Sequence, residues 1–133
     1  MNSIQPQELA SFLRRYRFPG GRVRGVRVRQ PSERDIAIEF RLGVRTAIKD
    51  LGTEPKPVRL KLRLGGVEEF RFQMRPNLPK VKLPDARIAH LNGLFYLAFD
   101  SLGLGPNERP EVFDFRAAEL FAGGRTLEWE EIG

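Results

Sequence analysis

Two stretches of the chain alternate between apolar and polar residues. Every second residue is apolar from Ile36 to Val44, and the same pattern returns from Val58 to Leu64. Successive side chains of a β-strand point to opposite faces of its sheet, so this period of two predicts strands. Each predicted strand has one buried apolar face and one charged, mostly basic face in water.

The N-terminal segment has the period of a helix instead. Its apolar residues recur at the spacing of an amphipathic stripe: Leu9, Phe12, Leu13 and Tyr16. Pro6 suits the first turn of a helix, and the arginines within residues 14–17 suit the last turn, where the helix dipole favours cations. We predict a helix over about residues 6–17, ended by the Phe-Pro-Gly-Gly segment at residues 18–21.

Asn92-Gly93 is the strongest local turn motif of the chain. Apolar residues flank it on both sides, and Asn-Gly between two strands predicts a two-residue type I′ turn. Such a turn places His90 opposite Phe95 in the neighbouring strand. The run 94–99 is apolar in both phases, which predicts a central strand covered on both faces. We expect the N-terminal helix to cover its second face.

Two Gly-Gly pairs lie between runs rich in apolar residues, at residues 65–66 and 123–124. Both pairs are predicted to be hairpin turns. The first turn joins the second alternating run to a strand over residues 67–74. The second turn closes a last hairpin within residues 112–132, and one turn of helix over residues 117–121 is the alternative there.

Together these elements predict a single domain over residues 1–133, of the α+β class and mainly β. We expect a curved antiparallel sheet or a β-sandwich of about six to eight strands over residues 22–132, with one N-terminal helix packed against it. The apolar phase of the strands is expected to be buried. These positions are Ile36, Ile38, Phe40, Leu42, Val58, Leu60, Leu62, Leu64, Phe70 and Phe72.

The composition is that of a soluble globular protein. Hydrophobic residues make up 41% of the chain and charged residues 30%, which excludes the disordered class. No apolar run approaches the roughly 18 residues that a membrane-spanning helix needs, and the first residues lack the pattern of a signal peptide. The chain has no cysteine, which excludes disulfides and thiolate metal sites. We therefore expect a cytoplasmic protein without a membrane partner.

Charge is distributed unevenly along the chain. Residues 1–98 hold 20 Lys or Arg against 9 Asp or Glu, a net charge of +11, whereas residues 99–133 hold 3 against 8, a net charge of −5. A basic body with an acidic end is compatible with an anionic partner. It also fits an acidic last strand that lies beside basic strands and neutralises them. We favour internal neutralisation, because opposite charges commonly pair across neighbouring strands.

The polar phase of the predicted strands contains one candidate binding surface. Basic residues recur there, and neighbouring strands would bring them into one cationic face. The aromatic residues of the same strands fall in the apolar phase. Such a face could contact phosphates but would not stack on bases, as nucleic-acid-binding sheets do. Its candidate residues for an anionic partner are Arg41, Arg59, Lys61, Arg63 and Arg71.

The spacing of the reactive residues predicts no catalysis, and we expect no enzyme, no cofactor and no metal. His90, the only histidine, is predicted to pack against Phe95 across the hairpin. No Gly-x-Ser-x-Gly motif presents a serine nucleophile, and no metal-ligand spacing includes the histidine. The acidic residues that could act as acid and base are scattered along the chain: Asp85, Asp100, Glu108 and Asp114.

Five short stretches share a pattern with a group of known proteins: residues 57–62, 66–72, 92–96, 115–117 and 127–130. They resemble small β-rich bacterial proteins of uncharacterised families, some of which are grouped with immunity proteins of polymorphic toxin systems. The shared motifs belong to strands and turns. The resemblance therefore implies a β-rich fold and a protein partner, and it assigns no functional residue.

The expected function is that of a non-enzymatic bacterial protein-binding module. In its sharpest form this is an immunity-like protein that binds by surface complementarity, with arginine and aromatic anchors. The alternative is an electrostatic nucleic-acid binder that uses the basic face. Retention on heparin or DNA, with steep release by salt, would distinguish the second function from the first.

Overall fold

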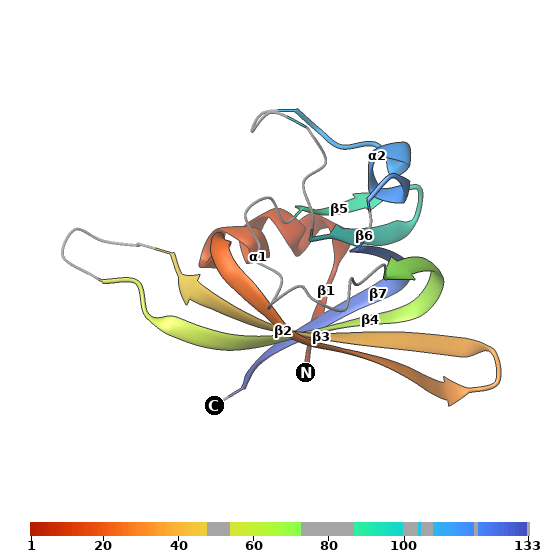
Figure 1. The fold of residues 1–133 in the computed structure, drawn as a ribbon, viewed down its shortest axis with the longest axis horizontal. Helices are drawn as coiled ribbons and strands as arrows, with labels where there is room; N and C mark the ends of the chain where they lie inside the picture. The colour runs from red at the N-terminus through yellow and green to blue at the C-terminus, as the bar shows by residue number, and fades with distance from the viewer. Residues whose placement is uncertain (48–53, 73–86, 100–103, 105–107, 119, 133) are drawn as a thin grey trace.

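A single curled antiparallel sheet forms most of the molecule (Figure 1). The computed structural model describes residues 1–47, 54–72, 87–99, 104, 108–118 and 120–132. Among these residues seven strands pair in the order β2-β3-β4-β7-β6-β5, with β1 paired to β7 beside this path. The predicted class, α+β and mainly β with a short N-terminal helix, is confirmed.

The bounds of the elements follow the chain from the N-terminus. The strands are β1 (Asn2–Ile4), β2 (Tyr16–Ser32), β3 (Asp35–Thr46), β4 (Pro57–Phe72), β5 (Arg87–Leu91), β6 (Leu94–Ala98) and β7 (Leu120–Ile132). The helices are the 3-10 turn η1 (Pro6–Glu8), α1 (Leu9–Arg15) and α2 (Val112–Arg116).

The N-terminal helix is shorter than predicted. It begins with a 3-10 turn at Pro6 and ends at Arg15, because the backbone becomes extended at Tyr16 and pairs there with β3. The apolar side of α1 packs on the sheet, as its spacing predicts. The ring centroid of Phe12 lies 5.7 Å from that of Tyr16 and 5.3 Å from that of Trp129 on β7.

The turn at Asn92-Gly93 is confirmed. Both residues have positive φ, 50° and 82°, and β5 pairs with β6 in the predicted register. Four of the five residues of β6 are buried, in both phases of the strand. The helix on its second face is α2, however, because α1 occupies the opposite face in the main core. Tyr96 of β6 lies against Phe115 of α2, with ring centroids 5.4 Å apart.

The two Gly-Gly pairs are not hairpin turns. β4 runs unbroken through residues 65–66, and β7 runs unbroken through residues 123–124. The segment before β7 forms α2 instead of a strand, and this helix precedes residues 117–121, where the alternative places it. Both hairpin predictions are therefore wrong. In Figure 1 the far end of β4 curls over beside β7. In the pairing of the two strands, Gly65 lies opposite Thr126, and Gly124 lies opposite Val67.

The glycines let β4 and β7 approach closely where they bend. The register shifts between Val67 and Glu69, where β4 has one residue more than β7. A methyl group on Gly124 would lie 2.7 Å from the carbonyl oxygen of Gly65, and Gly66 has a positive φ of 55°. Glycine allows both the close approach of the backbones and the positive φ without strain. Two Gly-Gly pairs in neighbouring strands thus mark a shared bulge and bend.

Most of the predicted core is confirmed. Six of the ten positions are at most 1% exposed: Ile38, Phe40, Leu42, Leu60, Leu62 and Leu64. Three more are partly buried against the same core: Ile36, Val58 and Phe72. The prediction for Phe70 is wrong, because 44% of this residue is exposed. It lies beyond the bulge of β4, at the rim of the core, where its ring packs on that of Phe72 with 5.5 Å between centroids.

We expect Gly124→Ala to lower the free energy of unfolding by about 1–3 kcal/mol, the usual cost of adding volume to a close-packed interior. The new methyl group would lie 2.7 Å from both the Gly65 carbonyl oxygen and Leu64 Cγ. Gly25→Ala is the matched control, because a methyl group there has no atom within 4 Å. Its effect is expected to stay within about 0.5 kcal/mol. Urea unfolding measures the free energy of unfolding of both variants. An equal loss of stability in the two would contradict the role of the close approach between β4 and β7.

Candidate anion-binding groove

Charged residues on the outer face of the sheet form rows across the strands. β3 and β4 alternate between core residues and outward-facing ones, and antiparallel pairing places the outward residues side by side. Four rows follow one another along β3. They are Arg27, Glu39, Arg63 and Glu128; Gly25, Arg41, Lys61 and Glu130; Arg22, Gly43, Arg59 and Ile132; and Arg17, Arg45 and Pro57.

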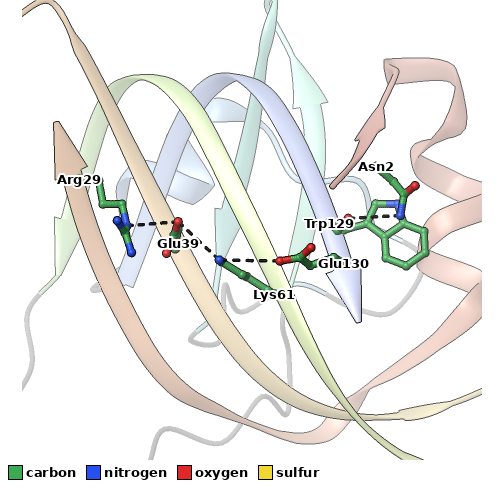
Figure 2. Close-up of polar contacts among 6 residues, drawn as sticks. All are labelled: Asn2, Arg29, Glu39, Lys61, Trp129 and Glu130. Atoms are coloured by element: carbon green, nitrogen blue, oxygen red, sulfur yellow. Dashed lines mark hydrogen bonds and ion pairs between the residues drawn. The ribbon is translucent and has the colours of Figure 1, made fainter. Parts of the chain in front are cut away.

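Glu39 links the first two rows through a chain of ion pairs (Figure 2). Its Oε1 lies 3.2 Å from Arg29 Nε and 3.7 Å from Lys61 Nζ. Lys61 Nζ also lies 3.8 Å from a carboxylate oxygen of Glu130. Glu39 is only 5% exposed, and its Oε2 has no hydrogen-bond partner among the described residues. This carboxylate therefore offsets the positive charge of the side chains that cover it.

The predicted internal neutralisation is confirmed for part of the sheet. β7 lies beside β4, with Glu130 opposite Lys61 and Glu128 opposite Arg63. Two further ion pairs of 2.8 Å join acidic residues of β4 to basic residues of the C-terminal part of the chain: Arg125 with Glu68, and Arg116 with Glu69. In these two pairs the acidic residue belongs to the body and the basic residue to the C-terminal part. Within the described residues, the acidic end therefore compensates the basic body where β7 lies beside Lys61 and Arg63 of β4.

The five residues predicted as one anionic-partner face lie in different environments. Lys61 and Arg63 belong to the first two rows, among acidic residues. Arg71 lies at the far end of β4, where its Nη1 donates a hydrogen bond of 3.2 Å to a backbone carbonyl at the end of α2. Arg41 and Arg59 are exposed and form no ion pair with a described residue.

The last two rows border a groove of about 1200 Å³. Five exposed arginines from β2, β3 and β4 line it: Arg17, Arg22, Arg24, Arg45 and Arg59. None of the five forms an ion pair within the described part of the chain. One acidic residue, Glu131, also lines the groove. Within the described part of the chain, the result is a concave site with five guanidinium groups that form no ion pair and a single carboxylate.

Glycines let β2, β3 and the side chain of Arg24 approach one another closely in this groove. A register shift makes β2 bulge over residues 18–21. Within the bulge Gly21 approaches β3 so closely that a methyl group on it would lie 2.5 Å from the Gly43 carbonyl oxygen. Arg24 lies over Gly43, where an added methyl group would be 2.8 Å from its Nε. The guanidinium of Arg24 therefore occupies the space that a side chain at Gly43 would fill, and the bulge of β2 packs directly on the backbone of β3.

Tyr16 engages the one carboxylate of the groove. Its hydroxyl donates a hydrogen bond of 2.6 Å to Glu131 Oε1. Burial raises the pKa of Tyr16 well above its ordinary value, and the hydrogen bond to Glu131 adds to the rise. Tyr16 therefore stays protonated at neutral pH and keeps Glu131 engaged at the edge of the groove.

The groove suits an anion that presents the oxygen atoms of carboxylate or phosphate groups. A guanidinium is charged at every physiological pH, and its rigid fork of donors matches carboxylates and phosphates. No aromatic residue is among the described residues that line the groove, so a nucleobase finds no stacking surface there. The other lining residues are apolar or glycine: Gly20, Gly21, Gly43, Val44, Pro57, Val58 and Ile132.

Only Arg59 of the five groove arginines belongs to the face predicted from the sequence. The pattern that could have indicated the others is a Gly-Gly pair next to alternating arginines, at residues 20–24, together with Gly43 between two arginines of β3. The two segments meet only because the bulge of β2 brings Arg22 opposite Gly43. Spacing along the chain does not encode that register.

The residues considered for catalysis do not come together in the described structure. His90 packs against Phe95, with 4.7 Å between ring centroids, as predicted. Asp114 accepts a hydrogen bond of 2.7 Å from a backbone N–H at the start of α2 and caps that helix. Asp85 and Asp100 lie outside the described residues. No three His, Asp or Glu residues of the described segments are grouped so that they could hold a metal ion.

Comparisons with protein-family models, curated proteins and solved structures find no match for this chain. Among the helices of the described segments, none has the length and apolar character to cross a membrane. The groove and the sheet that carries it are therefore the features from which a function of this chain can be inferred.

We expect Glu39→Gln to lower the free energy of unfolding by about 1–3 kcal/mol, because it removes the negative charge between Arg29 and Lys61. Glu130→Gln is the control, since its side chain is 40% exposed and its ion pair spans 3.8 Å. That change is expected to cost less than about 1 kcal/mol. Urea is the denaturant of choice, because it does not screen charge. The same loss in both variants would show that the burial of Glu39 is unimportant.

Proposed function

We propose that this protein is a non-enzymatic binding module that holds an acidic surface of another protein in the arginine groove. The main support is the set of five exposed arginines without ion-pair partners among the described residues. Like charges held close together raise the free energy of the unbound protein, and an anion that binds there relieves the repulsion. An acidic partner therefore gains more from this groove than from isolated surface arginines.

An acidic protein surface fits the groove better than a nucleic acid does. The groove combines arginines with apolar residues such as Val44, Val58 and Ile132, a mixture typical of protein interfaces. The described residues that line it offer no aromatic platform for bases. The neighbouring rows contain Glu39 and Glu130, so a phosphate backbone that continued along the sheet would meet negative charge.

In its sharpest form the proposal is a bacterial, cytoplasmic, immunity-like protein that binds its partner by surface complementarity. This form is supported by the resemblance of five short stretches and by the absence of cysteine. The neighbouring genes test it, because an immunity protein is encoded beside its toxin. A locus without a toxin gene would count against the immunity role and leave the binding module as proposed.

We expect the double variant Arg45→Gln with Arg59→Gln to bind poly-L-glutamate about tenfold or more weakly at low salt, since it removes two charge-assisted contacts. The matched control is Arg14→Gln with Arg34→Gln. It removes the same charge from exposed positions outside the groove, and binding is expected to change less than about twofold. Fluorescence anisotropy with labelled poly-L-glutamate measures the affinities, and circular dichroism confirms that the variants are folded.

Equal losses in the two double variants would mean that net charge alone drives binding, which would contradict the groove as the site. A DNA duplex of about 20 base pairs is the competing probe, since counterion release gives DNA binding a steep salt dependence. Tighter binding to DNA than to poly-L-glutamate, with an affinity that falls steeply with salt, would replace the proposal by the nucleic-acid alternative.

A further inference from the structure

Among the described residues, β2 is an edge strand with one side unpaired. It is 17 residues long and begins the strand order of the sheet, and β3 is its one strand partner among the described residues. In Figure 1 the hairpin of β2 and β3 extends to one side beyond the body of the molecule. An edge strand exposes backbone N–H and C=O groups with which a further strand can pair.

The two faces of this strand differ in chemistry. Arg22 and Arg27 lie on the outer side, are exposed and form no ion pair with a described residue. Val26 and Val28 lie on the core side, yet they are 37% and 49% exposed. Their partners on β3 are fully buried. The core thus covers β3 here and leaves the apolar side of β2 open.

β7 shows which kind of strand completes such an edge. β4 alternates between basic and apolar residues as β2 does. Residues 127–130 of β7, which pair with β4, alternate between apolar and acidic residues. Glu130 lies opposite Lys61 on the outer side, and Trp129 lies opposite Leu62 on the core side. An acidic–apolar strand therefore complements both faces of a basic–apolar strand at once.

We propose that the free edge of β2 binds an extended segment of the protein partner in which acidic and apolar residues alternate. The segment adds to the sheet as a further strand, with its acidic side chains beside Arg22 and Arg27 and its apolar side chains beside Val26 and Val28. This inference rests on the proposed function, because the arginines at the start of the edge, Arg22 included, also line the groove.

A second copy of this chain is a poorer occupant of the edge. Pairing of β2 with another β2 would place the arginines of the two copies side by side, and like charges across a strand pair are destabilising. Charged residues on an edge strand also guard against unwanted pairing. That protective role does not account for the two exposed valines on the other face, which an apolar row of a partner strand would cover.

The test uses the full-length protein and a labelled peptide with the sequence of residues 126–132, Thr-Leu-Glu-Trp-Glu-Glu-Ile. We expect the peptide to bind, and binding to slow amide hydrogen exchange within residues 22–29. A bound strand directs the backbone groups of alternate residues toward its neighbour. N-methylation of every second peptide residue is therefore expected to weaken binding about tenfold or more in one phase and hardly at all in the other.

The double variant Val26→Thr with Val28→Thr tests the apolar half of the proposal. Threonine keeps the shape and the strand preference of valine, so the sheet is retained. The peptide is expected to bind about threefold or more weakly, because less apolar surface is buried. Binding of poly-L-glutamate is expected to stay the same. Unchanged peptide affinity would overturn the assignment of the two valines to the interface.

Two outcomes separate this inference from the proposed function. If both N-methylated peptides bind as tightly as the parent peptide, or if exchange slows on β4 and not on β2, strand addition is overturned while groove binding stands. If neither the peptide nor poly-L-glutamate binds, the groove fails as a site for acidic proteins, and the edge proposal fails with it.

Discussion

The close contact of β4 and β7 at their glycines is the constraint on which the rest of the molecule depends. Because Gly65 and Gly124 have no side chains, the two strands can bulge and bend while they stay paired. The bend lets one half of β7 pair with β6 and the other half with β1, while both halves remain beside β4. One local feature thus joins the two halves of the sheet around the core and places acidic residues next to basic ones.

That placement divides the outer face into two zones. The row that contains Glu39 has two acidic and two basic residues, and in the row that contains Glu130 one carboxylate offsets part of the charge of two basic residues. Ion pairs through Glu39 connect the two rows. The rows that contain Arg22 and Arg45 have no acidic member. Paired charges of the first zone favour the folded state, whereas the repulsion in the second zone opposes it until an anion binds. The first zone therefore contributes to the stability of the fold, whereas the second zone contributes to binding.

Features that depend on residues close in sequence could be predicted. The period of two identifies the buried phase of β3 and β4, and Asn92-Gly93 determines both its turn and the register beside it. The Gly-Gly pairs could not be interpreted alone, because the same glycines suit a tight turn or a bend, and the facing strand decides between them. Phe70 follows the bulge that this bend creates, so the period of two along the sequence could not predict that its side chain is exposed. The groove likewise depends on a register between distant segments.

The bulge of β2 at residues 18–21 is what makes one strand serve both the groove and the edge. Arg17 and Arg22 are separated by an odd number of positions, so in a regular strand they would point to opposite faces of the sheet. The bulge changes the phase, and both face outward beside Arg45 and Gly43. After a second irregularity the phase again places arginine outside and valine on the core side. A regular β2 would disperse its arginines over two faces, and the irregular strand gathers them on one.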